Sequence, residues 1–309
     1  MKVAVLGYGT VGAGVYSMLS DAPGMEAGPV LVRPGKAVES FMVSDAALIF
    51  GDPTVDAVVE TLGGLDPAYS YGMRALEAGK HFITANKAMV AAHGLELAAL
   101  AREKGAAFLF SAACGGGVPF LHNLALSAET DRIEAVSGIL NGTTNYMLDA
   151  MQRRGLSYGN ALREAQSLGY AESDPTADVS GLDALRKMQL ACAVAFGVLP
   201  QSGMLCEGME HFTAADVEDI QSRGLVCRLM ARGSRAGESV SAYVEPVLFP
   251  RAAPESSVFT NNNMARYTGK RCGSIVLMGQ GAGRFPTASA VLRDLSAAQQ
   301  GARSMFPEN

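Results

Sequence analysis

The sequence predicts an α/β protein in which a doubly wound parallel sheet of the Rossmann type is joined to an α+β domain. Two observations support this fold class. The pattern GYGTVG at residues 7–12 follows a short apolar β segment and precedes a helical stretch. Short apolar β segments then alternate with helical segments up to about residue 120, which is typical of a parallel sheet covered by helices.

Length and composition fit a folded protein with a sizeable core. The 309 residues are 49% hydrophobic and 18% charged, and the formal net charge of -5 argues against a nucleic acid or an anionic membrane as partner. No apolar run approaches the roughly 18 residues that cross a bilayer, and the first apolar segment is too short for a signal peptide. Five scattered cysteines without a C-x-x-C pair favour a reduced, cytoplasmic protein.

The glycine pattern lies between an expected strand at 2–6 and a helix that runs to about residue 19. In this setting glycines permit a tight turn and let backbone N–H groups reach a pyrophosphate at the helix N-terminus. We therefore predict a dinucleotide site rather than a purely structural turn. The expected cofactor-binding residues of this loop are Gly7, Gly9, Thr10, Val11 and Gly12.

The next β segment, 30–32, ends at Arg33, about 20 residues beyond the glycines, and Lys36 adds a second cation. An arginine at this position suits the 2'-phosphate of NADP, whereas an acidic residue would hold the ribose of NAD. A solvated loop end is the plain alternative. Glu26 or Glu39 would supply the acid for NAD if the strand were placed differently. The sequence favours NADP, with NAD as the alternative.

The rest of this domain continues the alternation. Further strands are expected at 55–60, 81–84 and 107–112. Asp66 is expected to cap a helix with Pro67 at its first position, and another helix to cover about 95–104. Lys87 follows the strand at 81–84, and ligands bind at the carboxyl ends of such strands. Lys87 is thus either a surface lysine or part of the site.

After residue 120 the pattern becomes that of an α+β domain. Its expected elements are helices at 120–127, 141–145 onward, 160–168 and from Ser180, and β segments at 133–140, 225–230, 240–248 and 274–278. The glycine-rich stretch 279–283 and a helix at 287–295 return the chain to the first domain. We expect a nucleotide-binding domain at 1–120, completed by 280–309, and a catalytic and dimerisation domain at 121–279.

Asp183 and Lys187 lie four residues apart on the helix expected from Ser180, which carries no charge after Lys187. They could form a surface pair worth about 0.3–0.5 kcal/mol, with Ser180 and Asp183 as a capping box. However, the helix is apolar on both sides and should be buried, where charges must pair and have shifted pKa values. Such groups are candidates for proton transfer. Acidic residues that could hold an ammonium substrate precede them: Glu172, Asp174 and Asp178.

Several motifs together resemble the homoserine dehydrogenase family over nearly the whole chain. They are GYGTVG at 7–12, TANKA at 84–88, GILNGTTNYML at 138–148, GYAESDPTADVSGLDALRK at 169–187 and GQGAGRFPTASAVLRDL at 279–295. The resemblance implies reversible reduction of L-aspartate 4-semialdehyde to L-homoserine with NAD(P)H, on the path to threonine, isoleucine and methionine. It also implies a homodimer, and the chain is expected to be a short form without a C-terminal ACT domain.

The resemblance also implies roles for individual residues. Asp183 and Lys187 become the catalytic pair, and Lys87 lies at the active site and the cofactor. Which lysine delivers the proton stays open. Residues expected to bind the substrate are Tyr170, Glu172, Gly142 and Thr143, with Glu172 on the substrate amino group. Gly281 in the last motif is expected to contact the cofactor.

Ser111 departs from the family pattern, because many members have a glutamate there that helps hold a monovalent cation. A cation site near Cys114 and Gly116 is therefore expected to be weak or absent, and no other metal site is predicted.

Two alternatives to the implied activity remain. One is another amino-acid dehydrogenase of the same architecture; the other is a non-catalytic nucleotide-sensing relative, which would lack the catalytic set.

Overall fold

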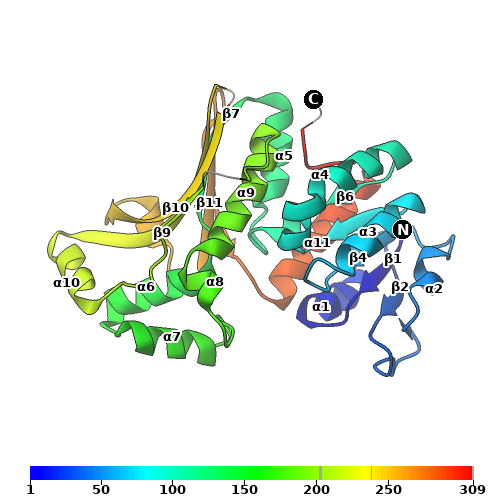
Figure 1. The fold of residues 1–309 in the computed structure, drawn as a ribbon, viewed down its shortest axis with the longest axis horizontal. Coiled ribbons are helices and arrows are strands. Elements are labelled where there is room, and N and C mark those ends of the chain that lie inside the picture. The colour runs from blue at the N-terminus through cyan, green and yellow to red at the C-terminus, as the bar shows by residue number, and fades with distance from the viewer. Residues whose placement is uncertain (202–203, 238, 308–309) are drawn as a thin grey trace. The chain divides into compact units, whose positions relative to one another are not determined.

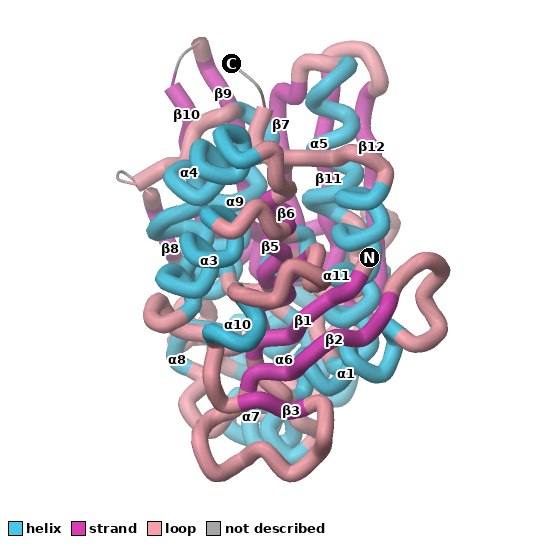
Figure 2. Tube along the Cα trace, turned by 90° about the vertical axis from the view of Figure 1, so that its right-hand side faces the viewer, coloured by secondary structure: helices cyan, strands magenta, loops and turns pink. Residues whose placement is uncertain are grey.

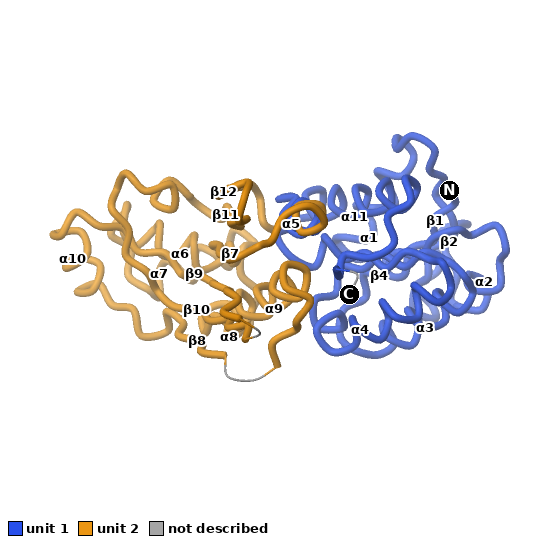
Figure 3. The backbone as a smooth tube through the Cα atoms, turned by 90° about the horizontal axis from the view of Figure 1, so that it is seen from above, with its two compact units in different colours: residues 1–125, 282–309 blue, residues 126–281 orange. Residues whose placement is uncertain are grey.

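The chain, represented by a computed structural model, forms two compact units, Met1–Ala125 with Ala282–Asn309 and Leu126–Gly281 (Figures 1 and 3). The structure describes residues 1–201, 204–237 and 239–307. No helix within these ranges is long and apolar enough to cross a membrane.

The first unit is built on a six-stranded parallel sheet with strand order β3-β2-β1-β4-β5-β6, in which β1, β2 and β3 lie side by side (Figure 2). The strands are β1 Lys2–Leu6, β2 Glu26–Leu31, β3 Met42–Val43, β4 Ala57–Glu60, β5 His81–Thr84 and β6 Phe108–Leu109. The helices are α1 Thr10–Leu19, α2 Ala47–Phe50, α3 Ala68–Glu77, α4 Lys87–Lys104, the 3-10 turn η1 Ser111–Ala113 and α11 Arg284–Gln299.

Helices cover both faces of this sheet, which confirms the predicted doubly wound fold. α1 packs against α11 on one face, and α3 packs against α4 on the other (Figure 3). The central strands β1, β4 and β5 are almost wholly buried, as a parallel sheet between two helical layers requires. Their continuous apolar runs, rather than an alternation of polar and apolar residues, follow from burial on both faces.

The second unit is built on a sheet of order β12-β11-β7-β9-β10-β8, antiparallel except where β8 meets β10. Its strands are β7 Ile133–Ile139, β8 Leu205–Cys206, β9 Leu225–Ala236, β10 Ser239–Pro250, β11 Asn262–Gly269 and β12 Gly273–Gln280. Its helices are α6 Gly142–Arg154, α7 Tyr158–Ser167, α8 Thr176–Val179, α9 Leu182–Phe196, α10 Ala214–Ser222 and the 3-10 turn η2 Pro254–Ser257, and α5 Phe120–Thr130 leads into it.

Helix α9 packs on one face of this sheet, against β7, β9 and β10. Its close approach requires a glycine in β9, since a Cβ at Gly233 would collide with the Cys192 sulfur of α9. Asp183 and Lys187 are carried by this helix, so its packing fixes the backbone of both residues.

Several elements differ from the prediction. Asp66 does not cap α3; the cap position belongs to Pro67, and the Asp66 carboxylate instead accepts from the Ser70 hydroxyl at 3.0 Å. Helix α4 begins at Lys87 rather than near residue 95, because the Asn86 side chain caps it. Gly94, which breaks the apolar pattern there, leaves room for the Phe306 ring.

Further corrections concern shorter elements. The strand expected at 107–112 is only β6, followed by η1. Ser180 ends α8 and does not begin the long helix, which starts at Leu182 after Gly181 in the left-handed region. The predicted capping box of Ser180 and Asp183 is therefore wrong. The sequence patterns also missed β11, the central partner of β7 and β12, and the short elements β3, β8, α2, α8 and α10.

Candidate functional site

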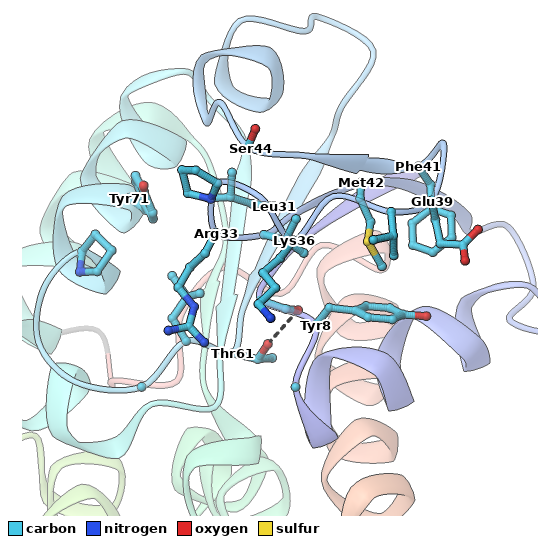
Figure 4. Close-up of a pocket in the computed structure, with 18 residues that line it drawn as sticks. Tyr8, Leu31, Arg33, Lys36, Glu39, Phe41, Met42, Ser44, Thr61 and Tyr71 are labelled. Carbon is cyan, nitrogen blue, oxygen red and sulfur yellow. Dashed lines mark hydrogen bonds between the residues drawn. The ribbon is translucent and has the colours of Figure 1, made fainter.

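A large pocket opens at the carboxyl end of β2, next to the glycine-rich loop after β1. Its volume is about 1120 Å³, and it is lined by the loop glycines, by residues that follow β2 and by the loop after β4 (Figure 4). The edge at which strands of a doubly wound sheet end is the place where such folds bind ligands. The location and size of the pocket both fit a dinucleotide.

The three glycines of the loop have different physical roles. Gly7 has a φ of +98°, and a Cβ on Gly12 would collide with the Gly7 carbonyl oxygen, so the turn itself requires both glycines. A Cβ on Gly9, in contrast, would meet no atom within 4 Å. The protein's own packing does not need a glycine there, but a ligand approaching the backbone at the N-terminus of α1 does. These residues fit a bound pyrophosphate.

Two cations extend into the same pocket from the segment that follows β2. Figure 4 shows the Lys36 side chain directed toward Tyr8 and Thr61 and the Arg33 side chain extending into the pocket beside it. Glu26 is the first residue of β2 and so lies at the opposite end of the strand from Arg33, which makes it the wrong candidate for an acid on the ribose. Glu39 does line the pocket, so that alternative stays open.

A buried carboxylate holds the backbone of the loop after β4, whose residues Leu62 and Gly63 line the pocket. Glu60, the last residue of β4, is 0% exposed; it accepts from the Leu62 N–H at 2.6 Å and from the Thr84 hydroxyl at 2.6 Å. The Asn86 N–H donates to the Thr84 hydroxyl oxygen at 2.9 Å, and Asn86 caps α4, of which Lys87 is the first residue. The network thereby fixes the backbone that carries Lys87. The sequence analysis did not identify Glu60 as part of the site. The signal that could have identified it is a charged residue at the end of an otherwise apolar strand.

In the second unit, Asp183 and Lys187 form a buried ion pair. The Lys187 Nζ lies 2.7 Å from Asp183 Oδ2 and donates to the Leu140 carbonyl oxygen at 2.7 Å, with side chains only 13% and 10% exposed. The surface-pair alternative is therefore wrong. A buried pair with this geometry keeps both groups in one arrangement, because separating them would leave a charge in a poorly solvated place.

Asn141 and Thr143 connect this pair to the preceding acidic loop. The Asn141 amide nitrogen donates to Asp183 Oδ2 at 3.0 Å and to Asp178 Oδ1 at 2.7 Å. The Thr143 hydroxyl lies 2.6 Å from the Tyr170 carbonyl oxygen and 3.0 Å from Asp178 Oδ2. Hydrogen bonds through Asp178 and Asn141 thus link Thr143 and the Tyr170 backbone to Asp183 and Lys187. Asn141, which the sequence analysis noted only as a helix start, lies at their centre.

Asp178 has an unusual electrostatic environment. Burial raises the pKa of its carboxyl, the nearby charge of Asp183 raises it further, and the hydrogen bond from Asn141 opposes both. The Thr143 hydroxyl has one proton, so it cannot donate to the Tyr170 carbonyl and to Asp178 at once. Protonation of Asp178 would let both contacts form as hydrogen bonds. The site therefore contains a carboxyl group whose pKa lies above its ordinary value.

The remaining predicted residues lie in different settings. Glu172 is exposed in the loop before α8, and its backbone carbonyl accepts from Gln166 at 3.1 Å. Gly142 begins α6 against the backbone of Asn261, where a Cβ would come within 2.8 Å of the carbonyl oxygen. Gly281 is buried, and a Cβ there would collide with the Asn263 side chain, so packing alone accounts for this glycine.

Ser111 is the position at which a weak or absent cation site is expected. In the structure it forms hydrogen bonds with Asp294 instead. Its N–H donates to Asp294 Oδ2 at 2.8 Å and its hydroxyl to Oδ1 at 2.5 Å. Asp294 lies on α11 and is 1% exposed. Burial raises the pKa of this carboxyl to about 7, although the Ser111 hydrogen bonds and the charge of Arg293 lower it. Cys114 nearby is a buried thiol.

A doubly wound sheet with a dinucleotide-shaped pocket, accompanied by a second unit that holds a buried acid–lysine pair, defines a nicotinamide-nucleotide-dependent oxidoreductase. The sequence profile of homoserine dehydrogenase matches residues 119–296, and that of the homoserine dehydrogenase NAD-binding domain matches residues 7–111. The chain belongs to the homoserine dehydrogenase family.

Individual relatives agree with this assignment. The chain is 37% identical to the homoserine dehydrogenase of Synechocystis sp., over 96% of this chain and 72% of that protein. It is 38% identical to that of Corynebacterium glutamicum, over 95% of this chain and 70% of that protein. The crystal structure of a homoserine dehydrogenase from Thiobacillus denitrificans matches with a TM-score of 0.91 at 34% identity, over 99% of this chain and 77% of that one.

Proposed function

We propose that this protein catalyses the reversible reduction of L-aspartate 4-semialdehyde to L-homoserine with NADP(H), in the biosynthesis of threonine, isoleucine and methionine. The observation that carries the proposal is the buried Asp183–Lys187 pair, held by Leu140 and Asn141 and linked by Asn141 to Asp178 of α8. In a member of this family, such a pair is suited to donating the proton that the reduction of a carbonyl group requires.

The proton chemistry follows from the pair's geometry. A bound nicotinamide nucleotide supplies the hydride for reduction and accepts it in the reverse direction. The substrate oxygen gains negative charge as the aldehyde is reduced, and a positioned ammonium stabilises that charge and donates a proton to it. Asp183, at 2.7 Å from Lys187, orients this ammonium and favours its charged form. Lys87, at the start of α4, is the second candidate for the proton donor.

Substrate recognition is proposed for the loop before α8 and the start of α6. Glu172 provides a carboxylate for the substrate ammonium, and Thr143 holds the backbone of Tyr170 through its hydroxyl at 2.6 Å. Gly142 adds the partly accessible backbone at the helix start. Fixing the ammonium end of a small amino acid orients its aldehyde, which is a proximity contribution to the rate.

Arg33 and Lys36 support NADP as the preferred cofactor, because both cations enter the pocket at the end of β2, where a 2'-phosphate would lie. The glycine loop and Lys87 complete the proposed cofactor site. The five cysteines are scattered without a C-x-x-C pair, and we propose a cytoplasmic location from this pattern.

We further propose that catalysis needs no added monovalent cation. Ser111 carries no carboxylate, and its N–H and hydroxyl both donate to Asp294. An assay in buffer free of sodium and potassium should retain most of the activity. Strong stimulation by either ion would show that backbone carbonyls near Cys114 and Gly116 suffice for a cation site.

The direct test of the function is homoserine oxidation followed by absorbance of the reduced nucleotide, with NADP and NAD in parallel. Homoserine-dependent reduction that is faster with NADP at low nucleotide concentration is the expected result. Turnover of another amino acid, such as aspartate, in place of homoserine would favour a different dehydrogenase. Nucleotide binding without turnover of either would favour a sensing protein.

A further inference from the structure

One residue of the second unit makes hydrogen bonds with both buried carboxylates of the candidate catalytic cluster and with the start of α6. Asn141 lies between β7 and α6 and is only 4% exposed. Its Oδ1 accepts from the Thr144 N–H at 2.8 Å and from the Thr144 hydroxyl at 3.0 Å. Its Nδ2 donates to Asp178 at 2.7 Å and to Asp183 at 3.0 Å.

These contacts determine the orientation of the amide. A backbone N–H can only donate, so the atom facing Thr144 must be the oxygen, and the nitrogen must face the two carboxylates. An amide group offers two N–H donors and two acceptor positions, and all four are used here. The side chain therefore has one arrangement, fixed on one side by the helix start and on the other by the two acids.

The neighbouring residue extends the same support to the lysine. Lys187 donates to the Leu140 carbonyl at 2.7 Å, while its partner Asp183 accepts from Asn141, the next residue along the chain. The segment 140–141 thus binds both members of the ion pair. Moving this segment or removing its amide would change the direction in which the pair points.

Asn141 also lets two carboxylates share one small volume. Asp178 and Asp183 both contact the same nitrogen, and like charges at this separation repel each other. Two N–H donors directed at the two acids reduce this repulsion. No other residue type of this size caps a helix through an oxygen while donating two hydrogen bonds from the same side chain.

We propose that Asn141 is a positioning residue of the reaction, which holds Asp183, and through it the Lys187 ammonium, in the orientation that catalysis uses. The inference rests on the proposed function, in which Asp183 and Lys187 act as the catalytic pair. Asn141 itself acts through these residues.

The test separates the capping role of Asn141 from its donor role. Asn141→Ser keeps a good helix cap but removes both N–H donors, and Asn141→Asp keeps the cap and the size but places a third carboxylate at the donors' position. Both variants should lower kcat by about tenfold or more and leave the KM for the nucleotide unchanged. The acidic limb of the pH profile of kcat/KM should move to higher pH, further in Asn141→Asp than in Asn141→Ser.

The matched control is Thr213→Ala, which removes the capping box of α10 in the same unit, far along the chain from the proposed machinery. It should lower the melting temperature but leave kcat and the pH profile at the wild-type values. If Asn141→Ser does not fold, Asn141→Asp carries the test, because it retains the size of the side chain as well as the cap.

A double-mutant cycle decides whether Asn141 acts through Asp183. Asn141→Ser combined with Asp183→Asn should cost no more in kcat than the larger single loss, whereas independent roles would give multiplied losses. Multiplied losses, or wild-type kcat and pH profile in folded Asn141 variants, would overturn the proposal. The proposed function fails separately, through wild-type protein that does not oxidise homoserine, and the catalytic assignment of the pair fails through a Lys187→Ala variant with full activity.

Discussion

At the scale of single residues, the site depends on charges placed where charges are normally avoided. Asp183 and Lys187 are almost fully buried, and a lone charge in such a place would be strongly unfavourable. The short contact between them, together with Leu140 and Asn141, supplies the partners that make burial tolerable. The same arrangement holds the ammonium in one orientation, which is what a proton donor requires.

Lys187→Ala should reduce kcat by about a hundredfold or more, the usual effect of removing a positioned acid or charge-stabilising group. Nucleotide affinity should be unchanged, because the dinucleotide pocket lies in the other unit. Asp183→Asn should also lower kcat, and the double variant should lose less than the product of the two effects. Steady-state kinetics of homoserine oxidation measure these losses.

The control is Arg186→Ala, which removes an exposed cation next to Lys187 on the same helix. It should retain wild-type kcat. A folded Lys187→Ala protein with full activity would contradict the assignment and leave Lys87 as the lysine candidate.

The preference for NADP over NAD is also expected to depend on single residues. Arg33→Ala should raise the KM for NADP far more than that for NAD, since a charge-assisted contact to phosphate contributes about 1.5–3 kcal/mol. Lys36→Ala should show the same selectivity with a smaller effect. Arg102→Ala, which removes an exposed arginine at the end of α4, should change neither KM. An equal loss for both cofactors would mean that Arg33 does not contact the 2'-phosphate.

At the scale of elements, the C-terminal helix α11 is held in the nucleotide-binding unit by a buried carboxyl group. Asp294 accepts two hydrogen bonds from Ser111, and α11 also packs along α1. The pKa of Asp294 is raised to about 7 by burial, against 3.8 for an ordinary aspartate. The folded state therefore binds more protons than the unfolded chain between these two values.

This shift predicts a pH dependence of stability. As pH rises from about 4 to about 7, the contribution of Asp294 to the free energy of unfolding should decrease, and above pH 7 it should level off. Asp294→Asn keeps the shape but cannot ionise, so it should melt at a higher temperature than wild type at pH 7.5, by about 3 °C or more, and the difference should shrink toward pH 4.5. Thermal denaturation across this range measures it.

Glu77→Gln is the matched control, because it neutralises an exposed carboxylate of the same unit. Its melting temperature should follow that of the wild type at every pH. A constant difference between Asp294→Asn and wild type across the range would show that the carboxyl does not titrate there.

At the scale of the whole molecule, the outer strand β12 of the second sheet exposes apolar side chains on the face opposite α9, whereas Ile139, Met230 and Met264 on that face are buried with Val258. Helix α9 covers one face, where it meets Gly233, and the register places Val276 and Met278 of β12 on the other. Val276 is 40% exposed and Met278 is 49% exposed. Exposed apolar side chains on a sheet face are typical of an interaction surface, and we propose that a homodimer forms through this part of β12.

Val276→Glu should convert the dimer into a monomer, because a twofold interface would bring two buried carboxylates together. Light scattering coupled to size-exclusion chromatography measures the change in mass. Leu248→Glu introduces the same charge at an exposed position on the opposite face of the sheet and should leave the mass unchanged. A monomeric wild type, or a dimer that survives Val276→Glu, would contradict this interface.

The sequence by itself determined the features that local rules control. The glycine loop, the apolar strands of the parallel sheet and the helix opened by Asn141 follow from short-range patterns of turn chemistry, burial on both faces and capping. The burial of Asp183 and Lys187 also followed from the pattern, because a helix that is apolar on both sides has no surface on which to expose them.

Only the tertiary structure decided which distant residues meet. Asn141 and Asp183 are 42 residues apart, and Ser111 and Asp294 are 183 apart, yet each pair shares a hydrogen bond. From the sequence, Glu60 is only the last residue of a strand. The folded structure shows that its carboxylate accepts hydrogen bonds from the Leu62 N–H and the Thr84 hydroxyl. Local patterns report the propensity of a segment, whereas the partners of a buried polar group depend on how the chain packs segments that are remote in sequence.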